Sequence, residues 1–369
     1  MVLALEKLGF IKPTEIQTRA VPHLLNKESA FISASTGTGK TLAYLIPILS
    51  KLDPDSKQLQ ALILAPSHEL AVQIHQQFQA LQQALESSTK SMLILGESSV
   101  SRQKEKLKKK PHVIIGTSGR VLELIEMKKL KVHATQHFVI DEADKQLAGD
   151  ALLKIQAIIK PMPKDNQLLC ASATHTKEVL DEAILLRPEI RLLESENNRI
   201  HPNIAHLYFT VAGNDKADLL RKVLHALSPK KSIVFFHRSQ NAERLRKRLN
   251  EKELPAVSLF RDLDKLSRKR NLQAFREGTH PILLSTDLAS RGIDIKEIEF
   301  VVNFDSPSDS HNYLHRAGRT GRMGKSGTCI SLFNNEEMRL IKRYQKDLKI
   351  KMLPSEIYKG QIRTSESSQ

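Results

Sequence analysis

The chain has 369 residues, of which 40% are hydrophobic and 27% charged, a composition that suits a soluble protein with two domains. No apolar run approaches the ~18 residues of a membrane span, and the charged Glu6 and Lys7 exclude a secretory signal peptide. The net charge of +16 is concentrated after residue 204, where 31 Lys and Arg residues face 19 Asp and Glu residues. Such an excess favours a polyanionic partner.

The chain contains two cysteines, Cys170 and Cys329. Each lies in a strand-like apolar run, far from any Cys-x-x-Cys spacing, so a metal site or a disulfide is disfavoured. We expect two buried free thiols in a reducing compartment, and therefore a cytoplasmic protein.

Short apolar runs rich in β-formers alternate with helical stretches along the whole chain, which predicts parallel strands joined by crossover helices. The expected strands of the first half are Ala30–Ser33, Ala61–Ala65, Met92–Leu95, Val113–Gly116, Phe138–Ile140 and Leu168–Ala171. Those of the second half are Ser232–Phe236, Ala256–Leu259, Ile282–Ser285, Phe300–Asn303 and Thr328–Leu332. Helices are expected between them, for example Glu69–Leu85 and Ala242–Asn250. The fold class is therefore α/β, with two tandem lobes that each hold a parallel sheet flanked by helices.

A polar stretch without periodicity, residues 194–203, contains Pro202 and is the best linker candidate. We expect an N-terminal lobe at residues 1–195, a linker at 196–204, a C-terminal lobe at 205–360 and a frayed polar tail at 361–369. The basic cluster Arg102–Lys110 is interpreted as a solvated helix face and loop.

Residues 34–41, Ala-Ser-Thr-Gly-Thr-Gly-Lys-Thr, follow an expected strand and open an expected helix. A glycine-rich turn at such a place lets successive backbone N–H groups face a phosphate chain. Lys40 can neutralise the β and γ oxygens, and the hydroxyl of Thr41 can bind Mg²⁺. The pattern predicts half of a nucleotide-hydrolysis site.

The sequence Asp141-Glu142-Ala143-Asp144 supplies the other half. The strand before it ends at Asp141, which is placed to hold a metal through water, and Glu142 is a candidate base for the attacking water.

The segment Arg316–Arg322 carries three arginines and two glycines in seven residues. Cations on a flexible or tight turn suit a developing phosphoryl charge. The loop from Ser285 to Asp294 follows an expected strand of the same half and offers hydroxyls, carboxylates and Arg291.

With these motifs in this order, the chain resembles a DEAD-box RNA helicase, a superfamily 2 ATPase with two RecA-like lobes. The resemblance extends over about residues 9–335. The chain is similar to the short bacterial members of the family that have only the two-lobe core, several of which act in ribosome assembly.

For the ATP site, the resemblance implies that Gln17 reads the adenine edge and that Phe10 stacks on the ring. The phosphate-binding residues would be Ser35, Thr36, Gly37, Thr38, Gly39, Lys40 and Thr41. Thr41 and Asp141 would hold Mg²⁺ and Glu142 would be the base. From the second lobe, Asp294 would approach the ribose, and Arg319 and Arg322 would reach the γ-phosphate as arginine fingers.

For the RNA site, the resemblance implies contacts to phosphates and 2′-hydroxyls that are largely independent of sequence. The matching positions are Pro66, Thr117, Arg120, Arg238, Thr286 and Arg291. Ser172, Thr174 and His315 would couple this site to the ATP site. The chain departs from the family on the RNA side, where His68 replaces an arginine, Phe260-Arg261-Asp262 replaces His-Gly-Asp and Lys265 replaces a glutamine.

The resemblance implies RNA-stimulated ATP hydrolysis coupled to local duplex separation or to remodelling of RNA–protein particles, with ATP and Mg²⁺ as cofactors. The expected partners are RNA and ribosomal or pre-ribosomal particles, and we expect a monomer without a membrane partner. Because the departures gather on the RNA side, an ATP-gated RNA clamp with little unwinding activity is the alternative. A DNA-translocating helicase is disfavoured by the Gln17 motif and by Asp-Glu-Ala-Asp, and a GTPase by the lack of an Asn-Lys-x-Asp element.

Overall fold

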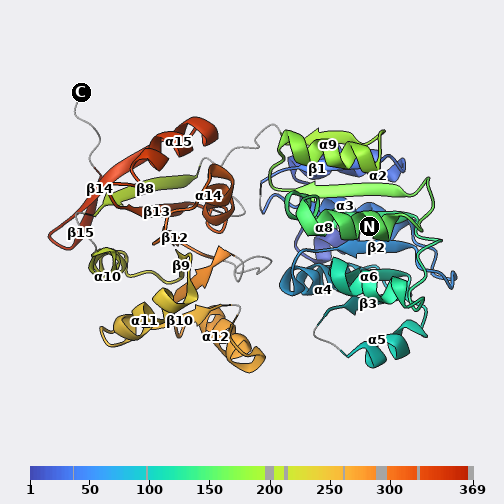
Figure 1. Ribbon diagram of the computed structural model, residues 1–369, viewed down its shortest axis with the longest axis horizontal. Helices are drawn as coiled ribbons and strands as arrows, with labels where there is room; N and C mark the ends of the chain where they lie inside the picture. Colours follow the sequence, from blue (N-terminus) through green and yellow to red (C-terminus); the bar gives the residue numbers. More distant parts are fainter. Residues whose placement is uncertain are drawn as a thin grey trace. The chain divides into compact units, whose positions relative to one another are not determined.

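The computed structural model describes residues 1–35, 37–96, 99–195, 203–211, 215–260, 262–287, 297–321 and 325–364. The chain divides into two compact units, Met1–Asn198 and Arg199–Gln369, here called the N-terminal and the C-terminal unit. Each unit has its own sheet with helices on both faces (Figure 1). Among the described residues, no helix combines the length and the apolar character that a membrane span requires.

The N-terminal unit alternates strands with helices. Its strands are β1 Ala30–Ser33, β2 Ala61–Leu64, β3 Ser91–Ile94, β4 Val113–Gly116, β5 His137–Asp141, β6 Gln167–Ser172 and β7 Arg191–Glu194. Its helices are α1 Val2–Lys7, α2 Glu15–Leu25, α3 Lys40–Lys51, α4 His68–Ala84, α5 Val100–Leu107, α6 Ser118–Glu126, α7 Ala143–Gln146, α8 Gly149–Ile159 and α9 Lys177–Leu186.

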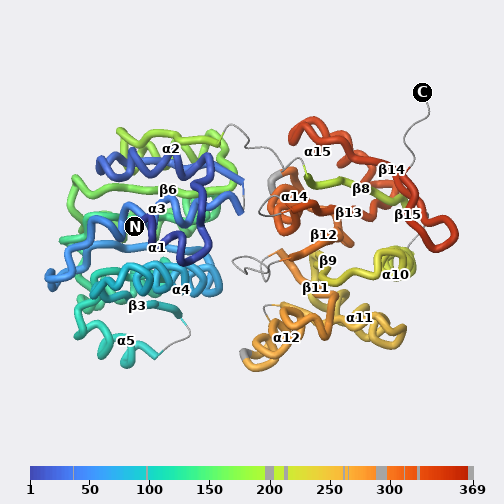
Figure 2. The backbone as a smooth tube through the Cα atoms, turned by 180° about the vertical axis from the view of Figure 1, so that it is seen from behind, coloured from blue at the N-terminus to red at the C-terminus, as the bar shows by residue number. Residues whose placement is uncertain are grey.

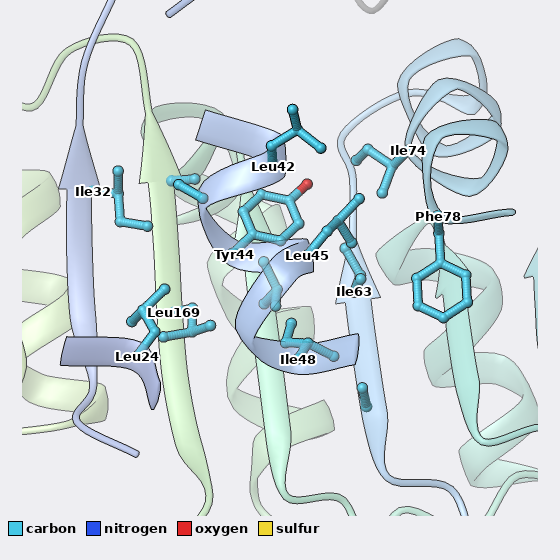
Figure 3. Close-up of a cluster of buried hydrophobic side chains, with 14 of the residues drawn as sticks. Leu24, Ile32, Leu42, Tyr44, Leu45, Ile48, Ile63, Ile74, Phe78 and Leu169 are labelled. Atoms are coloured by element: carbon cyan, nitrogen blue, oxygen red, sulfur yellow. The ribbon is translucent and has the colours of Figure 1, made fainter. Parts of the chain in front are cut away.

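The N-terminal sheet has the strand order β3-β4-β2-β5-β6-β1-β7, and its pairings are parallel. Its inner strands are largely apolar because helices cover both faces, as in β1, β2 and β4. Alternate residues therefore enter different cores: Ile63 packs with α2, α3 and α4, whereas Leu62 and Leu64 pack with α6, α8 and α9. The views from opposite sides show these two helix layers (Figures 1 and 2), and Figure 3 shows the core around α3.

The C-terminal unit is built in the same way. Its strands are β8 Ile204–Thr210, β9 Ser232–Phe236, β10 Ala256–Leu259, β11 Ile282–Thr286, β12 Phe300–Asn303, β13 Gly327–Phe333, β14 Met352–Tyr358 and β15 Gln361–Thr364. Its helices are α10 Lys216–Leu227, α11 Ser239–Asn250, α12 Lys265–Glu277, α14 Ser310–Ala317 and α15 Arg339–Leu348.

The C-terminal sheet has the order β10-β11-β9-β12-β13-β8-β14-β15. Its described pairings are parallel except for β15, which runs antiparallel to β14. Phe235 packs with α12, α14 and α15 on one face, and Phe236 packs with α10 and α11 on the other. Both rings are almost fully buried, with relative exposures of 1% and 0%.

The expected strands are all present, with their ends within one residue of the expected positions. The expected tail at 361–369 is wrong at its start, because Gln361–Thr364 forms β15 and pairs with β14. The expected linker at 196–204 is wrong at its end, because β8 begins at Ile204. Its residues 196–202 lie outside the described part of the chain. Both cysteines are buried and free, as expected.

Candidate functional site

The predicted site residues of the N-terminal unit lie at the carboxyl ends of its strands, where parallel α/β sheets usually bind ligands. The segment that carries Lys40 follows β1, Asp141 ends β5 and Ser172 ends β6, and these three strands are neighbours in the order β5-β6-β1. Pro66 and Thr117 follow β2 and β4, which are adjacent further along the same sheet. One edge of the sheet thus presents two neighbouring groups of polar residues.

The turn between β1 and α3 has the geometry of an anion-binding loop. Gly37 and Gly39 have φ angles of 83° and 91°, which side chains rarely tolerate. Helix α3 begins at Lys40 without a side-chain cap, so its first N–H groups remain directed at the loop. The Lys40 ammonium donates to the carbonyls of Ala34 and Ser35, which holds its charge over the same turn.

Gln17 contacts this loop from α2. Its Oε1 accepts from the N–H of Thr14 at 2.9 Å, and its Nε2 donates to the carbonyl of Gly39 at 3.1 Å. A Cβ added to Gly39 would lie 2.4 Å from Gln17 Nε2, so only glycine permits this approach. The structure therefore brings Gln17 against the phosphate-loop turn, whereas the Phe10 side chain is 39% exposed.

Asp141 is buried, with a relative exposure of 5%. Its Oδ2 accepts from the Tyr44 hydroxyl at 2.8 Å, and its Oδ1 accepts from the N–H of Glu142 at 2.8 Å. Burial raises the pKa of Asp141 to about 6, while the hydrogen bonds and the charge of Lys40 act in the opposite direction. Two donors thus orient this carboxylate. Tyr44 was found only in the structure, although its i, i+3 relation to Thr41 places both on one face of α3.

Glu142 has a left-handed backbone, with φ 47° and ψ 53°, and forms the N-cap position of α7. This backbone conformation is strained for a glutamate, and strained residues of this kind concentrate at functional sites. Its carboxylate accepts from the Lys145 ammonium one turn along α7. Gln146 donates to the carbonyls of Asp141 and Leu64, which ties this segment to β2.

Ser172 connects β6 to the same segment. Its hydroxyl donates to the Asp144 carboxylate at 2.7 Å, and it accepts a long hydrogen bond of 3.4 Å from the N–H of Thr174. A side-chain hydrogen bond therefore joins Asp144, in the segment after β5, to the residue that ends β6. This is a physical link of the kind that the predicted coupling role requires.

The donor set around Asp141 suits Mg²⁺. The Thr41 hydroxyl and the Asp141 carboxylate are hard oxygen ligands, and both belong to the groups around Tyr44. Among the described residues, no cluster of three or more His, Cys, Asp or Glu side chains could hold a metal by itself. Mg²⁺ in nucleotide sites commonly takes one or two protein oxygens and completes its shell with phosphates and water.

The second group of the N-terminal unit gathers around Arg120. Its guanidinium donates to the carbonyl of Gly96 at 2.6 Å and pairs with Glu123 at 2.8 Å. Thr117 is the N-cap residue of α6, and its N–H bonds to the carbonyl of Ile94 at 3.3 Å. The loops after β3 and β4 are thus joined beside Pro66.

In the C-terminal unit, Arg238 and Thr286 lie at the ends of the adjacent strands β9 and β11. They line a pocket of about 530 Å³ together with His237 and Asp287. The Arg238 side chain is exposed, and that of Thr286 is partly exposed. The structure therefore brings together these two predicted RNA-contacting residues.

The arginines of the 316–322 segment differ in environment. Arg316 is 1% exposed and pairs with both carboxylate oxygens of Asp287, at 2.6 and 2.7 Å. It also donates to Asn303 and to the Asp305 carbonyl, so it fastens together the loops after β11 and β12. The expectation that all three arginines suit a phosphoryl charge is therefore wrong for Arg316.

His315 and Arg319 are both buried, with exposures of 8% and 7%, at the end of α14 and just after it. Four predicted residues, Thr36, Arg291, Asp294 and Arg322, lie outside the described residues.

The fold and these motifs agree with the comparisons with known proteins. The family model described as DEAD/DEAH box helicase matches residues 14–183, and that described as helicase conserved C-terminal domain matches residues 215–324. The chain is 39% identical to the DEAD-box ATP-dependent RNA helicase CshC of Bacillus cereus, over 97% of this chain and 91% of that protein. It is 37% identical to the probable ATP-dependent RNA helicase YfmL of Bacillus subtilis, over 96% of this chain and 94% of that protein. The chain belongs to the DEAD-box ATP-dependent RNA helicase family.

Solved structures confirm two tandem RecA-like lobes. S. cerevisiae Dbp5 bound to RNA and ADP BeF3 matches with a TM-score of 0.87 and 31% identity, over 95% of this chain and 92% of that chain. Mss116p bound to ssRNA and AMP-PNP matches with a TM-score of 0.85 over 96% of this chain and 77% of that chain, and at 24% identity it supports the fold alone.

Proposed function

We propose that this chain hydrolyses ATP in response to RNA and uses the cycle to separate short RNA duplexes or to remodel RNA–protein particles. One observation carries the proposal. In a chain of this family, the glycine-rich turn after β1 and the Asp141–Glu142 pair at the end of β5 lie at one edge of a sheet, and a single strand, β6, separates β1 from β5.

In this proposal the turn and the first N–H groups of α3 bind the phosphates, and Lys40 neutralises their charge. Gln17 selects adenine, and Phe10 covers the ring. Glu142 orients the attacking water and takes up its proton. Thr41 and Asp141 hold Mg²⁺, which when bound neutralises phosphate charge.

The C-terminal unit completes the site. Arg319 and Arg322 stabilise the charge that develops on the transferred phosphoryl group, and Asp294 contacts the ribose. RNA that binds both units favours the arrangement in which these groups meet ATP, so RNA accelerates hydrolysis by differential binding. Ser172, Thr174 and His315 link the two events, and the Ser172–Asp144 bond supports this role.

The RNA strand runs over Pro66, Thr117 and Arg120 of the first unit and over Arg238, Thr286 and Arg291 of the second. Cations and backbone groups at strand ends recognise phosphates rather than bases, so binding is largely independent of sequence and falls with salt. The similarity to an RNA-bound structure of Dbp5 supports this assignment.

The deciding experiment measures the ATPase rate of the purified chain with single-stranded RNA, with DNA of the same sequence and without nucleic acid. We expect strong stimulation by RNA alone. The proposal is contradicted if DNA stimulates the ATPase to the same degree as RNA, or if neither RNA nor DNA changes the rate. Strand displacement on a short RNA duplex, assayed beside it, then measures the unwinding step.

A clamp that holds RNA while ATP is bound, with little unwinding, is the second candidate. One observation favours it. Arg120 is a proposed RNA contact, but its guanidinium already donates to the carbonyl of Gly96 and pairs with Glu123, so fewer of its donors remain for RNA. RNA-stimulated ATPase without displacement of a short duplex would support the clamp.

We further propose that the chain acts as a monomer in the cytoplasm on ribosomal or pre-ribosomal RNA. Two buried free thiols support a reducing compartment. Crosslinking the protein to RNA in cells and sequencing the bound RNA tests the target, because an absence of ribosomal sequences among the enriched RNAs contradicts it.

A further inference from the structure

A second pocket of the C-terminal unit continues the one that holds Arg238 and Thr286. It has a volume of about 590 Å³ and extends along α11, where Arg244 and Lys247 line it. The two pockets share Ser239, Gln240, Phe260 and Asp262. They therefore form one continuous depression, here called the α11 groove, which leads from the ends of β9 and β11 along the helix.

The far part of the α11 groove presents positive charge. Gln240, Arg244 and Lys247 occupy one face of α11, because they follow each other at four and three residues. From Gln240 to Lys247 the helix rises by about 10 Å. Both cations are exposed, and among the described residues neither forms an ion pair, although the charge of Lys247 helps to lower the pKa of Glu243 one turn earlier.

The acidic residues of the groove are already engaged. Glu243 accepts from Arg246 at 2.6 to 3.0 Å and from the Ser258 hydroxyl at 3.1 Å. The hydrogen bonds and the charge of Arg246 hold the pKa of Glu243 below its usual value. Asp262 accepts from the Ser239 hydroxyl at 2.9 Å, in the part that the two pockets share. Beyond that point Arg244 and Lys247 determine the local charge.

The far part of the α11 groove offers cations, and among the described residues that line it no exposed ring is available for base stacking. Phe260 is 4% exposed and packs into the core with α10 and α11. An occupant is therefore recognised by its negative charge and not by its bases. The strand whose phosphates reach Arg238 and Thr286 can continue into the groove without a break.

We propose that Arg244 and Lys247 bind two further backbone phosphates of the same RNA strand and so lengthen the RNA footprint along α11. This inference rests on the proposed function, since it extends the RNA path of that site. The contact adds affinity for longer RNA and leaves the chemical step untouched, because neither side chain belongs to the ATP site.

The test is the double variant Arg244→Ala/Lys247→Ala. Arg339→Ala/Lys342→Ala is its matched control, because it removes the same two residue types at the same spacing from exposed positions of α15. Within this unit α15 and α11 lie on opposite faces of the sheet, in different cores. Alanine favours helix at exposed positions, so both variants should fold, which thermal unfolding verifies.

For each protein, the RNA concentration that half-saturates the ATPase is measured with a homopolymer lengthened one nucleotide at a time. We expect the groove variant to stop gaining affinity about two nucleotides earlier than the wild type. With long RNA, the slope of log affinity against log salt should weaken by about 1.4, since each phosphate contact to a single strand contributes about 0.7. The ATPase rate of the groove variant at saturating RNA should equal that of the wild type. The control variant should match the wild type in length dependence, salt slope and rate.

Equal length dependence and equal salt slope in the groove variant and the wild type overturn the inference. An equal loss in the α15 control also overturns it, because the effect would then come from net charge alone. A wild type that no RNA of any length stimulates contradicts the proposed function instead, so the two failures are distinguishable.

Discussion

The Tyr44 hydroxyl of α3 donates to Oδ2 of Asp141 at the end of β5, across 97 positions of the chain, and both side chains are buried. The ring of Tyr44 belongs to the core between α2, α3 and α4, where it lies among leucine and isoleucine side chains (Figure 3). The apolar core thus sets the direction of a carboxylate that the proposal assigns to Mg²⁺.

Tyr44→Phe removes this donor and keeps the ring. Loss of a group that orients a metal ligand commonly costs 10- to 100-fold in metal affinity or activity. We expect the Mg²⁺ concentration for half-maximal ATPase to rise about tenfold, while thermal unfolding changes little. A Mg²⁺ titration of the ATPase that matches the wild type would show that the hydrogen bond has no role in metal binding.

Glu142→Gln removes the proposed base and keeps the size of the side chain. General base catalysis contributes about 10² to 10⁴ in rate, so turnover should fall by at least about 100-fold while ATP still binds. The variant also loses the ion pair with Lys145. Lys145→Ala is therefore the control, and it should retain most of the activity. Substantial turnover in Glu142→Gln would exclude this residue as the base.

Arg319→Ala should spare ATP binding, which the proposal assigns to the N-terminal unit. If Arg319 acts as an arginine finger, the variant should reduce RNA-stimulated turnover by about 10³ or more. Equilibrium nucleotide binding and steady-state ATPase measure the two effects separately. If residues 1–198 alone hydrolysed ATP as fast as the whole chain, the division of the site between two units would be wrong.

Arg316→Ala should act on stability. Removal of one partner of a buried, hydrogen-bonded ion pair costs about 3 kcal/mol or more, and Arg316 makes four hydrogen bonds to Asp287, Asn303 and Asp305. Urea unfolding of the C-terminal unit should shift accordingly. Arg316→Lys keeps the charge but loses the bidentate contact with Asp287, so its unfolding midpoint should lie between those of the wild type and the alanine variant. An unchanged unfolding midpoint in the alanine variant contradicts a structural role.

His206 should make the C-terminal unit sensitive to acid. Burial lowers the pKa of His206 to about 4, and its ring bonds to the Tyr313 hydroxyl at 2.9 Å. Because the unfolded chain binds the proton more tightly, near pH 6.5, the stabilisation is present above that pH and is lost as the pH falls toward 4.

His206→Asn keeps a hydrogen-bonding group near the same position and cannot titrate. Between pH 7 and pH 4 the free energy of unfolding should fall by about 3 kcal/mol more in the wild type than in this variant. Parallel pH profiles of thermal unfolding for the two proteins would show that another group causes the acid sensitivity.

Most residues of the strands that the sequence predicts are buried, and in several of these strands, such as β1 and β9, every residue is buried. Strand β7 has no fully buried residue, and β14 carries Pro354 and Glu356, so neither shows a strong apolar pattern. The polar residues after strands were predictable for a different reason: the spacing of a phosphate-binding turn is encoded in consecutive residues of the sequence.

Contacts between distant segments were not predictable. Arg316 pairs with Asp287, which lies 29 positions earlier, and nothing in the sequence near Arg316 indicates this partner. In the sequence, Arg316 looks the same as the other arginines of its segment. The bond between Tyr44 and Asp141 depends in the same way on the order of strands in the sheet.

The short strand β15 ends the C-terminal sheet, and the Arg363 guanidinium lies 3.9 Å from the centre of the Tyr358 ring on β14. A charged strand of four residues is a poor template for another chain, whereas the backbone groups of β14 beneath it would be a good one. Strand β15 thus covers the edge of β14: without Gln361–Thr364, the exposed backbone groups of β14 could pair with a strand of a neighbouring molecule and promote aggregation.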